Sequence, residues 1–163
     1  MIDLTMHEER LQHAIDRAKE RNILIPTFAQ MQNPALIPEN VKKALKNVGL
    51  WDVNPLNLFR ISWHNEPTMQ GGGFGGVNFI ELPSALTGVD ARRIVMCGKW
   101  FTTGCHKVGA SFGCLAPRLV TGQFDPTYNK AVWPSTGNYC RGGAYNSKLL
   151  GCDSIAILPA EMS

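Results

Sequence analysis

Apolar residues fall on one helical face in two stretches near the start of the chain. The first follows Thr5 and Glu8, which have the spacing of a capping box, and predicts an amphipathic helix over residues 6–21. The second opens at Pro38 and ends at Gly49, a residue type that often terminates helices. We therefore expect a helical layer here that packs against the rest of the protein and carries no evident chemistry.

The segments around these helices have a different character. Residues 23–38 are rich in proline and predict an extended or irregular connection. Residues 57–63 carry enough apolar side chains to predict a short strand, followed by the polar residues His64, Asn65 and Glu66. A solvated turn is the simpler interpretation of these three residues, and the lining of a pocket is the alternative.

From residue 93 onward, apolar runs that predict buried strands alternate with helical patterns. The runs are residues 93–97, 131–133 and 155–158. An apolar stripe from Val108 to Leu119 predicts one helix, which we expect to end or kink near Ala116 because Pro117 lacks a backbone donor. A second helix is expected over residues 140–150. This order indicates an α/β fold with a parallel sheet and crossover helices, in which ligands gather at the carboxyl ends of strands.

Composition describes an ordinary globular chain of 163 residues, with 44% hydrophobic and 18% charged residues. No apolar run approaches the roughly 20 residues of a membrane span, and the N-terminus lacks the pattern of a secretory signal. The net charge of +3 is spread over scattered basic residues, which is not the pattern of a nucleic-acid-binding surface. We expect neither a membrane nor a nucleic acid as partner.

The five cysteines are odd in number, and no two of them form a CxxC pair. A zinc site, another metal site or a disulfide framework is therefore not expected. Free thiols, several of them buried, indicate a reducing compartment and hence a cytoplasmic location.

A glycine-rich run at residues 71–76 satisfies the pattern GxGxxG. In dinucleotide-binding folds that pattern follows a strand and opens a helix, whereas here the next residues look extended. We interpret the run as a flexible loop. A loop that closes over substrate and the nucleotide site of an oxidoreductase are the alternatives.

Lys107 stands where the predicted strand 93–97 gives way, through a Thr/Gly turn, to the N-terminus of a helix. The helix dipole disfavours a cation at that position. A lysine is more easily explained there if the terminus also holds an anion, or if its amine is neutral or consumed in an imine.

Two motifs resemble those of a known enzyme family. Thr103-Gly104-Cys105-His106-Lys107 is similar to the cofactor-lysine segment of pyridoxal-phosphate (PLP) enzymes related to the tryptophan synthase β-subunit, and Pro134-Ser135-Thr136-Gly137-Asn138 resembles their Ser/Thr-Gly-Asn loop. That superfamily includes cysteine synthase, threonine synthase and serine/threonine dehydratases. The resemblance implies β-elimination or β-replacement on an amino acid, in a lyase or synthase whose Schiff-base lysine is Lys107.

The resemblance also assigns roles to the second motif. Asn138 would donate to the 3′ oxygen of the cofactor, and Gly137 would leave room for the ring. Ser135 and Thr136, with Gly137, would bind the substrate α-carboxylate. This arrangement orients the substrate for loss of its α-proton, and we expect Lys107 to be shielded from water.

His106 has two interpretations of nearly equal weight: by resemblance it would donate to the cofactor phosphate, and otherwise it is a packing histidine. Members of the family are also longer, and the loop that cradles the phosphate and the partner of the pyridine nitrogen do not follow Asn138 here. We therefore expect residues 78–163 to be the N-terminal part of a PLP-binding domain and residues 1–77 to be a packing segment. The chain alone would be inactive, completed by a C-terminal chain or a homologous subunit in a homo- or hetero-oligomer. A non-catalytic partner of a full-length homologue is the alternative.

Overall fold

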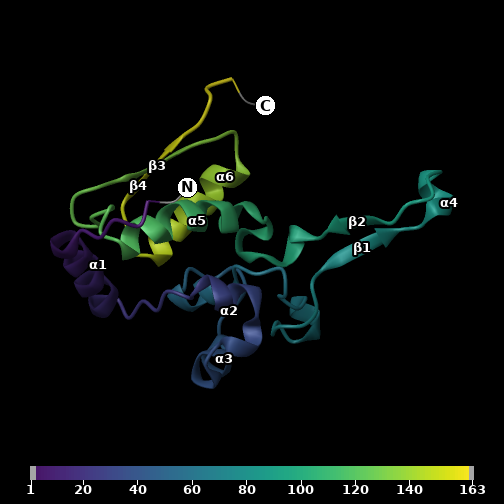
Figure 1. The fold of residues 1–163 in the computed structure, drawn as a ribbon, viewed down its shortest axis with the longest axis horizontal. Coiled ribbons are helices and arrows are strands. Elements are labelled where there is room, and N and C mark those ends of the chain that lie inside the picture. The colour runs from purple at the N-terminus through teal and green to yellow at the C-terminus, as the bar shows by residue number, and fades with distance from the viewer. Residues whose placement is uncertain (1–2, 162–163) are drawn as a thin grey trace.

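The computed structural model describes residues 3–161, which form a helical body from which one long arm extends (Figure 1). The helices are α1 (Glu8–Glu20), α2 (Phe28–Gln32), α3 (Glu39–Leu45), α4 (Ser84–Thr87), α5 (Lys107–Val120) and α6 (Asn138–Leu149). The strands are β1 (Phe79–Leu82), β2 (Arg93–Met96), β3 (Ala131–Pro134) and β4 (Ser154–Ile157). Among these residues, no helix combines the length and apolar character needed to cross a membrane.

Helix α1 begins at Glu8 with His7 as its N-cap, so the prediction of a cap at Thr5 is wrong. The amide of His7 instead donates to the carbonyl of Thr121 at 2.8 Å, and this tertiary contact fixes where the helix starts. A true capping box occurs at Thr27, which opens α2 inside the segment predicted to be irregular.

Residues 55–60 form a 3₁₀ helix where the sequence predicts a strand. Asn54 accepts a hydrogen bond from the amide of Leu56, and Pro55 occupies the first helical position. These two local signals favour a helical turn, and they outweigh the preference of Phe59 and Ile61 for a strand.

Helix α5 confirms the predicted apolar stripe, and its four members Val108, Phe112, Leu115 and Leu119 are buried. The helix continues through Pro117 to Val120, however, and does not end near Ala116. Pro117 and Leu119 are both buried, so the packing of this last turn outweighs the loss of one backbone hydrogen bond.

The strands form two separate two-stranded sheets, not one parallel sheet. β3 and β4 are parallel and joined by α6, which confirms a crossover unit of the predicted kind. β2 pairs with β1 in an antiparallel hairpin in which Phe79 lies opposite Met96. The protein is therefore a mixed α/β protein with small sheets.

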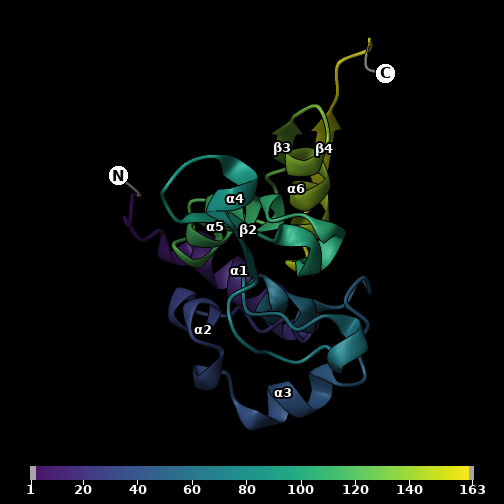
Figure 2. The same cartoon turned by 90° about the vertical axis from the view of Figure 1, so that its right-hand side faces the viewer.

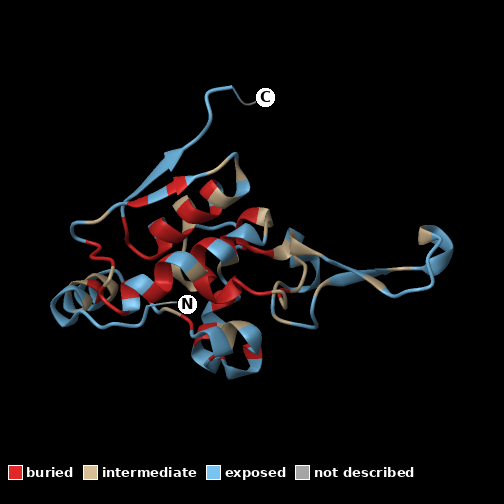
Figure 3. Cartoon of the chain, turned by 45° about the horizontal axis from the view of Figure 1, so that its top comes forward, coloured by how far each residue is buried: buried red, intermediate tan, exposed pale blue. Residues whose placement is uncertain are grey.

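The hairpin β1–β2 and helix α4 make up the arm that extends from the body (Figure 1). The predicted burial of residues 93–97 is wrong, since Ile94, Val95 and Met96 are exposed (Figure 3). Strand β4 is likewise exposed along its whole length, which contradicts the predicted burial of residues 155–158. Apolar sequence predicts a preference for burial, but it does not supply the segment that covers the strand.

The main core lies where α1, α5, α6 and β3 meet (Figure 2). It draws Ala14, Ile23 and Leu58 from the first half of the chain onto Phe112 and Leu149 of the second half. A second, smaller cluster gathers around α3 and the 3₁₀ helix, and its buried members are Ile37, Val41, Leu45 and Phe59. All five cysteines are free thiols, and Cys140 and Cys152 are buried.

Candidate functional site

The turn that leads into Lys107 is held in an unfavourable conformation. Thr103 has φ of +66° and ψ of 0°, a left-handed geometry that is rare for a β-branched residue. Gly104 has φ of +70°, and a Cβ added there would lie 2.5 Å from the ring of Trp51. The backbone conformation of Thr103 alone costs about 1–3 kcal/mol, and such strain clusters at functional sites.

Two hydroxyl groups in the same turn lack a hydrogen-bond partner. Thr102 is fully buried and Thr103 is 6% exposed, and neither Oγ1 atom finds a partner among the described residues. Leaving a buried polar group unsatisfied costs about 1–3 kcal/mol. Strain and unsatisfied hydroxyls therefore coincide immediately before Lys107, which marks this turn as a candidate site.

Helices α5 and α6 pack against each other at close range. A Cβ added at Gly142 of α6 would lie 2.8 Å from the Cα of Val108 and 3.1 Å from the carbonyl carbon of Lys107. One turn later in α6, the amide of Asn146 donates to the Val108 carbonyl at 2.7 Å and to Ser111 Oγ at 2.8 Å. These contacts join the first turn of α5 to the middle of α6, while the Tyr139 hydroxyl at the start of α6 donates to Cys114 Sγ in the middle of α5 at 3.4 Å.

Each of the two motif residues begins one of these packed helices. Lys107 is the first residue of α5 and Asn138 is the first residue of α6. Neither helix has a side-chain cap or an acidic residue in its first turn. The free amides of each first turn and the dipole of each helix favour an anion at that N-terminus.

Lys107 and Asn138 are both exposed, so the expectation that Lys107 is shielded from water does not hold in this structure. The reason is local: Lys107 begins its helix at the surface, and it is the next residue, Val108, that turns fully into the core. Its amine is accessible to a ligand from solvent.

Ser135 anchors the loop between β3 and α6 on its strand side. The amide of Ser135 donates to the carbonyl of Ile157 at 3.1 Å, and Ser135 Oγ accepts from the amide of Gly137 at 3.2 Å. Thr136 is exposed, and Gly137 is the N-cap of α6. The hydroxyl of Ser135 already closes the turn, while Thr136 is open to solvent.

His106 is exposed, and its ring contacts an aromatic neighbour. It stacks on Trp63 with ring centroids 5.7 Å apart and planes inclined by 23°. On its other side lies Gly98, where an added Cβ would come 3.3 Å from His106 Nδ1. The residue is exposed and its stacking uses only a face of the ring, so both interpretations of His106 stay open.

A hollow of about 240 Å³ adjoins the strained turn and contains residues that the sequence analysis missed. Its walls include Thr103, Trp51, Arg141 and Tyr145. The Arg141 guanidinium lies 5.9 Å from the centre of the Trp51 ring, and burial raises the pKa of Tyr145 to about 12. The available signal was the position of Arg141 in the first turn of a helix, where the dipole disfavours a cation.

The residues that hold the two helices together were also missed. Gly142 and Gly143 stand in the middle of α6, where glycine weakens a helix, and this is a signal of close packing. An added Cβ at Gly143 would overlap the Trp133 ring of β3. Asn146 and its hydrogen-bond partner Ser111 are 35 residues apart in sequence, so no local pattern signals their contact.

A larger hollow lies away from Lys107 and Asn138, and none of the residues of the two motifs lines it. His64 and Glu66 do line it, so these two residues fit the alternative that the polar residues after position 63 line a pocket. Asn65 is only 2% exposed and donates to the carbonyls of Arg60 and Trp100, which contradicts the solvated-turn interpretation.

Comparisons with protein-family models, with curated proteins and with solved structures found no match to this chain.

Proposed function

We propose that this chain binds pyridoxal 5′-phosphate through Lys107 and belongs to a PLP-dependent enzyme that performs β-elimination or β-replacement on an amino acid. One observation carries the proposal: a strained turn with two unsatisfied buried hydroxyls leads into Lys107, the first residue of α5, and Asn138 is the first residue of α6, the helix that packs on the first turn of α5. A reactive amine, a neutral amide donor and an anion-favouring pair of helix N-termini are the groups that such a cofactor requires.

The residues present fit part of the cofactor well. The accessible amine of Lys107 suits an aldehyde, and the uncapped amides suit a phosphate or a carboxylate. The unsatisfied hydroxyls of Thr102 and Thr103 indicate that this turn is built for more than its own stability. His106 stacks on Trp63 through a ring face, which leaves its in-plane nitrogens for the donor role.

PLP, when bound, supplies an electron-withdrawing ring that stabilises negative charge at the substrate α-carbon. The chain's own residues then have separate tasks. Lys107 Nζ takes the proton from the α-carbon, and Asn138 orients the ring without adding charge. Thr136 and the amides at the start of α6 bind the substrate carboxylate and so fix which bond is broken. Closure of the site by a further chain or subunit would shield Lys107 from water.

The proposal is tested by absorbance spectroscopy of the native preparation mixed with PLP, with every co-purifying chain retained. We expect a visible band that borohydride removes, and loss of that band in Lys107→Ala. Lys148→Ala, an exposed lysine of α6, is the matched control and should keep the band. A colourless wild-type preparation, or a band that survives Lys107→Ala, would contradict the proposal.

A second candidate function, an interaction partner without catalysis, is favoured by the exposed apolar strands. Phe79, Ile80 and Val95 on the arm and Ile155 and Ile157 on β4 are all near half exposed. Apolar strands of this kind often mark contact surfaces between proteins. This candidate predicts a stable complex with a homologous chain and no borohydride-sensitive band on this chain.

The nucleotide alternative requires a helix directly after the glycine run. The run leads into β1 instead, so the structure contradicts that alternative.

A further inference from the structure

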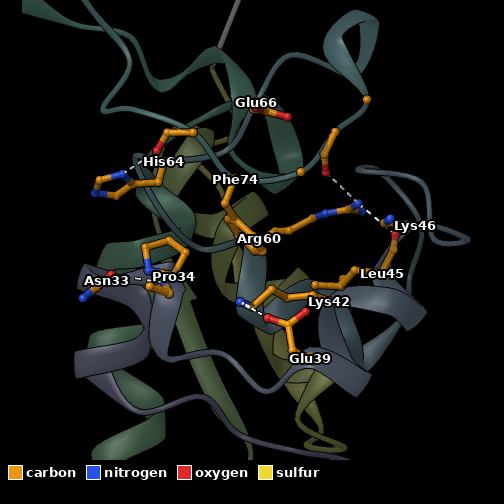
Figure 4. Close-up of a pocket in the computed structure, with 15 residues that line it drawn as sticks. Asn33, Pro34, Glu39, Lys42, Leu45, Lys46, Arg60, His64, Glu66 and Phe74 are labelled. Atoms are coloured by element: carbon orange, nitrogen blue, oxygen red, sulfur yellow. Dashed lines mark hydrogen bonds and ion pairs between the residues drawn. The ribbon is translucent and has the colours of Figure 1, made fainter.

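A cavity of about 890 Å³ lies between α3 and the glycine loop, which we define as residues 71–75 (Figure 4). Pro34 and Leu45 contribute apolar walls on one side, and Phe74 contributes one from the loop. The cavity is separate from the helix N-termini described above, because neither Lys107 nor Asn138 lines it. A volume of this size suits a small ligand with room for its side chain.

Arg60 supplies a buried positive charge to this cavity. The residue is 5% exposed, and its terminal nitrogens donate to the carbonyls of Leu45, Val48 and Gly72 and to Asn57 Oδ1. No carboxylate within residues 3–161 forms an ion pair with it. A buried charge that lacks a counter-ion favours binding of an anionic group.

Glu66 also lines the cavity and supplies a negative charge to it (Figure 4). The residue is partly buried, and its carboxylate makes no ion pair or hydrogen bond in the described part of the chain. It lies directly against the glycine loop: a Cβ added at Gly73 or at Gly75 would come 3.2 Å from one of its oxygens. The glycines therefore make room for this carboxylate, which gives a physical reason for the run.

Three further charged residues line the cavity: Lys42 and Glu39, which form an ion pair, and Lys46. Lys42 Nζ lies 2.7 Å from Glu39 Oε1, so these two charges compensate each other. Lys46 is exposed and forms no ion pair with any described residue. The terminal N–H groups of Arg60 are all engaged, so Arg60 offers an anion its charge, whereas Lys46 offers an ammonium group and Glu66 offers a carboxylate to a cation.

We propose that this cavity binds a free α-amino acid, with its carboxylate on the side of Arg60 and Lys46 and its ammonium group toward Glu66. A zwitterion satisfies both unpaired signs of charge, whereas a phosphate ester would leave the Glu66 carboxylate without a counter-ion. The inference does not depend on Lys107, so an amino acid held here lies apart from any chemistry at the helix N-termini.

The test is saturation-transfer NMR of the native protein in buffer free of PLP, with each of the twenty common amino acids as probe. Propionate and propylamine, which carry only one of the two charges, are the comparison compounds. We expect saturable binding of at least one amino acid, and binding of the single-charge compounds that is weaker by about tenfold or more.

Two pairs of variants locate the binding. Glu66→Gln should weaken binding by about tenfold, whereas Glu9→Gln on the exposed face of α1 should leave it unchanged. Gly73→Ala should also weaken binding, because the new methyl group displaces the Glu66 carboxylate. Gly76→Ala is its control, since an added Cβ there meets nothing within 4 Å.

Three results would overturn the inference: no amino acid binds, Glu66→Gln binds as well as wild type, or binding disappears in Lys107→Ala. The last result would place the amino acid at the helix N-termini instead. Failure of the proposed PLP chemistry has a different signature, the missing absorbance band, and leaves this experiment unaffected.

Discussion

At the scale of single residues, one buried amide ties the candidate site together. Asn146 is fully buried, and its Nδ2 atom donates both to the Val108 carbonyl and to Ser111 Oγ. The Ser111 hydroxyl in turn donates to the carbonyls of Lys107 and Val108. A short polar network inside an apolar interface therefore fixes the first turn of α5, the turn that carries Lys107.

Replacing Asn146 with alanine should destabilise the protein by about 1–3 kcal/mol, because the buried network loses two hydrogen bonds and the side chain that packs between the helices. Urea denaturation followed by circular dichroism measures the change. Asn47→Ala, at an exposed position, is the control and should change stability by less than about 0.5 kcal/mol. An Asn146→Ala variant as stable as this control would show that the network does not hold the helices together.

A second residue-scale contact makes stability depend on pH. His13 Nδ1 of α1 lies 2.8 Å from Asp125 Oδ2. The hydrogen bond to Asp125 raises the pKa of His13 above its ordinary value of 6.5. Burial opposes ionisation of Asp125, but hydrogen bonds from Thr127 and His13 lower its pKa from 3.8 to about 2.

The two shifts define a pH window. The His13 contribution is complete below about pH 6.5 and is lost as pH rises through its raised pKa, while the Asp125 contribution is lost as pH falls from about 4 toward about 2. His13→Gln should therefore lower the urea midpoint at about pH 5.5 and have much less effect at about pH 9. Equal effects at both pH values would mean that the charged pair contributes nothing.

At the scale of elements, glycine sets the distance between α5 and α6. Gly142 lets the backbone of α6 approach the Val108 backbone of α5, and backbone cannot give way as a flexible side chain can. Gly113 of α5 has no such neighbour, since an added Cβ there meets nothing within 4 Å. The two helical glycines thus form a matched pair with opposite expectations.

Gly142→Ala should destabilise the protein by about 1–3 kcal/mol, because the methyl group forces the helices apart. Gly113→Ala should stabilise it by about 0.5–1 kcal/mol, because alanine favours a helix more than glycine does. Thermal unfolding of both variants checks the two signs. A stabilising Gly142→Ala would mean that the helices do not pack as closely as the structure describes.

Local sequence patterns predicted the elements whose signals are local. The stripe of Val108 and Phe112, the strand ending at Pro134 and the helix before Gly151 all depend on spacing and on turn residues. The parallel strands around α6 followed from the order of these elements. What failed was burial, as at Ile94 and Ile155, because an apolar side chain does not specify which segment will cover it.

Some features of the candidate site were likewise predictable from local sequence, and others were not. A motif predicted that Lys107 begins a helix, and the structure has it there. The hollow beside Trp51 and the network of Asn146 come from contacts between residues far apart in sequence, which no local pattern reports. The exposure of Lys107 was missed because a motif carries no information about solvent.

At the scale of the whole molecule, one core joins the two halves of the chain. Ala14 and Ile23 pack into the same cluster as Phe112, Trp133 and Leu150. Helix α1 is further fixed to the later part of the chain by the hydrogen bond from His7 to Thr121. The body should therefore unfold as one unit, although its sequence suggests two parts.

Far-UV circular dichroism and tryptophan fluorescence should report coincident urea transitions, because buried Trp133 lies in the core that α1 also joins. Two resolved transitions, with fluorescence changing separately from helix content, would instead indicate that residues 1–77 fold independently of the rest.

The anchoring of the loop between β3 and α6 on its strand side has a practical consequence. Gly142 and Asn146 hold α6 against α5, and Ser135 holds the loop against β4. Thr136 is exposed and takes part in none of these contacts. Substitutions at this position, or grafted tripeptides of other sequence, can therefore be screened to alter which carboxylic acids the protein accepts while its scaffold stays intact.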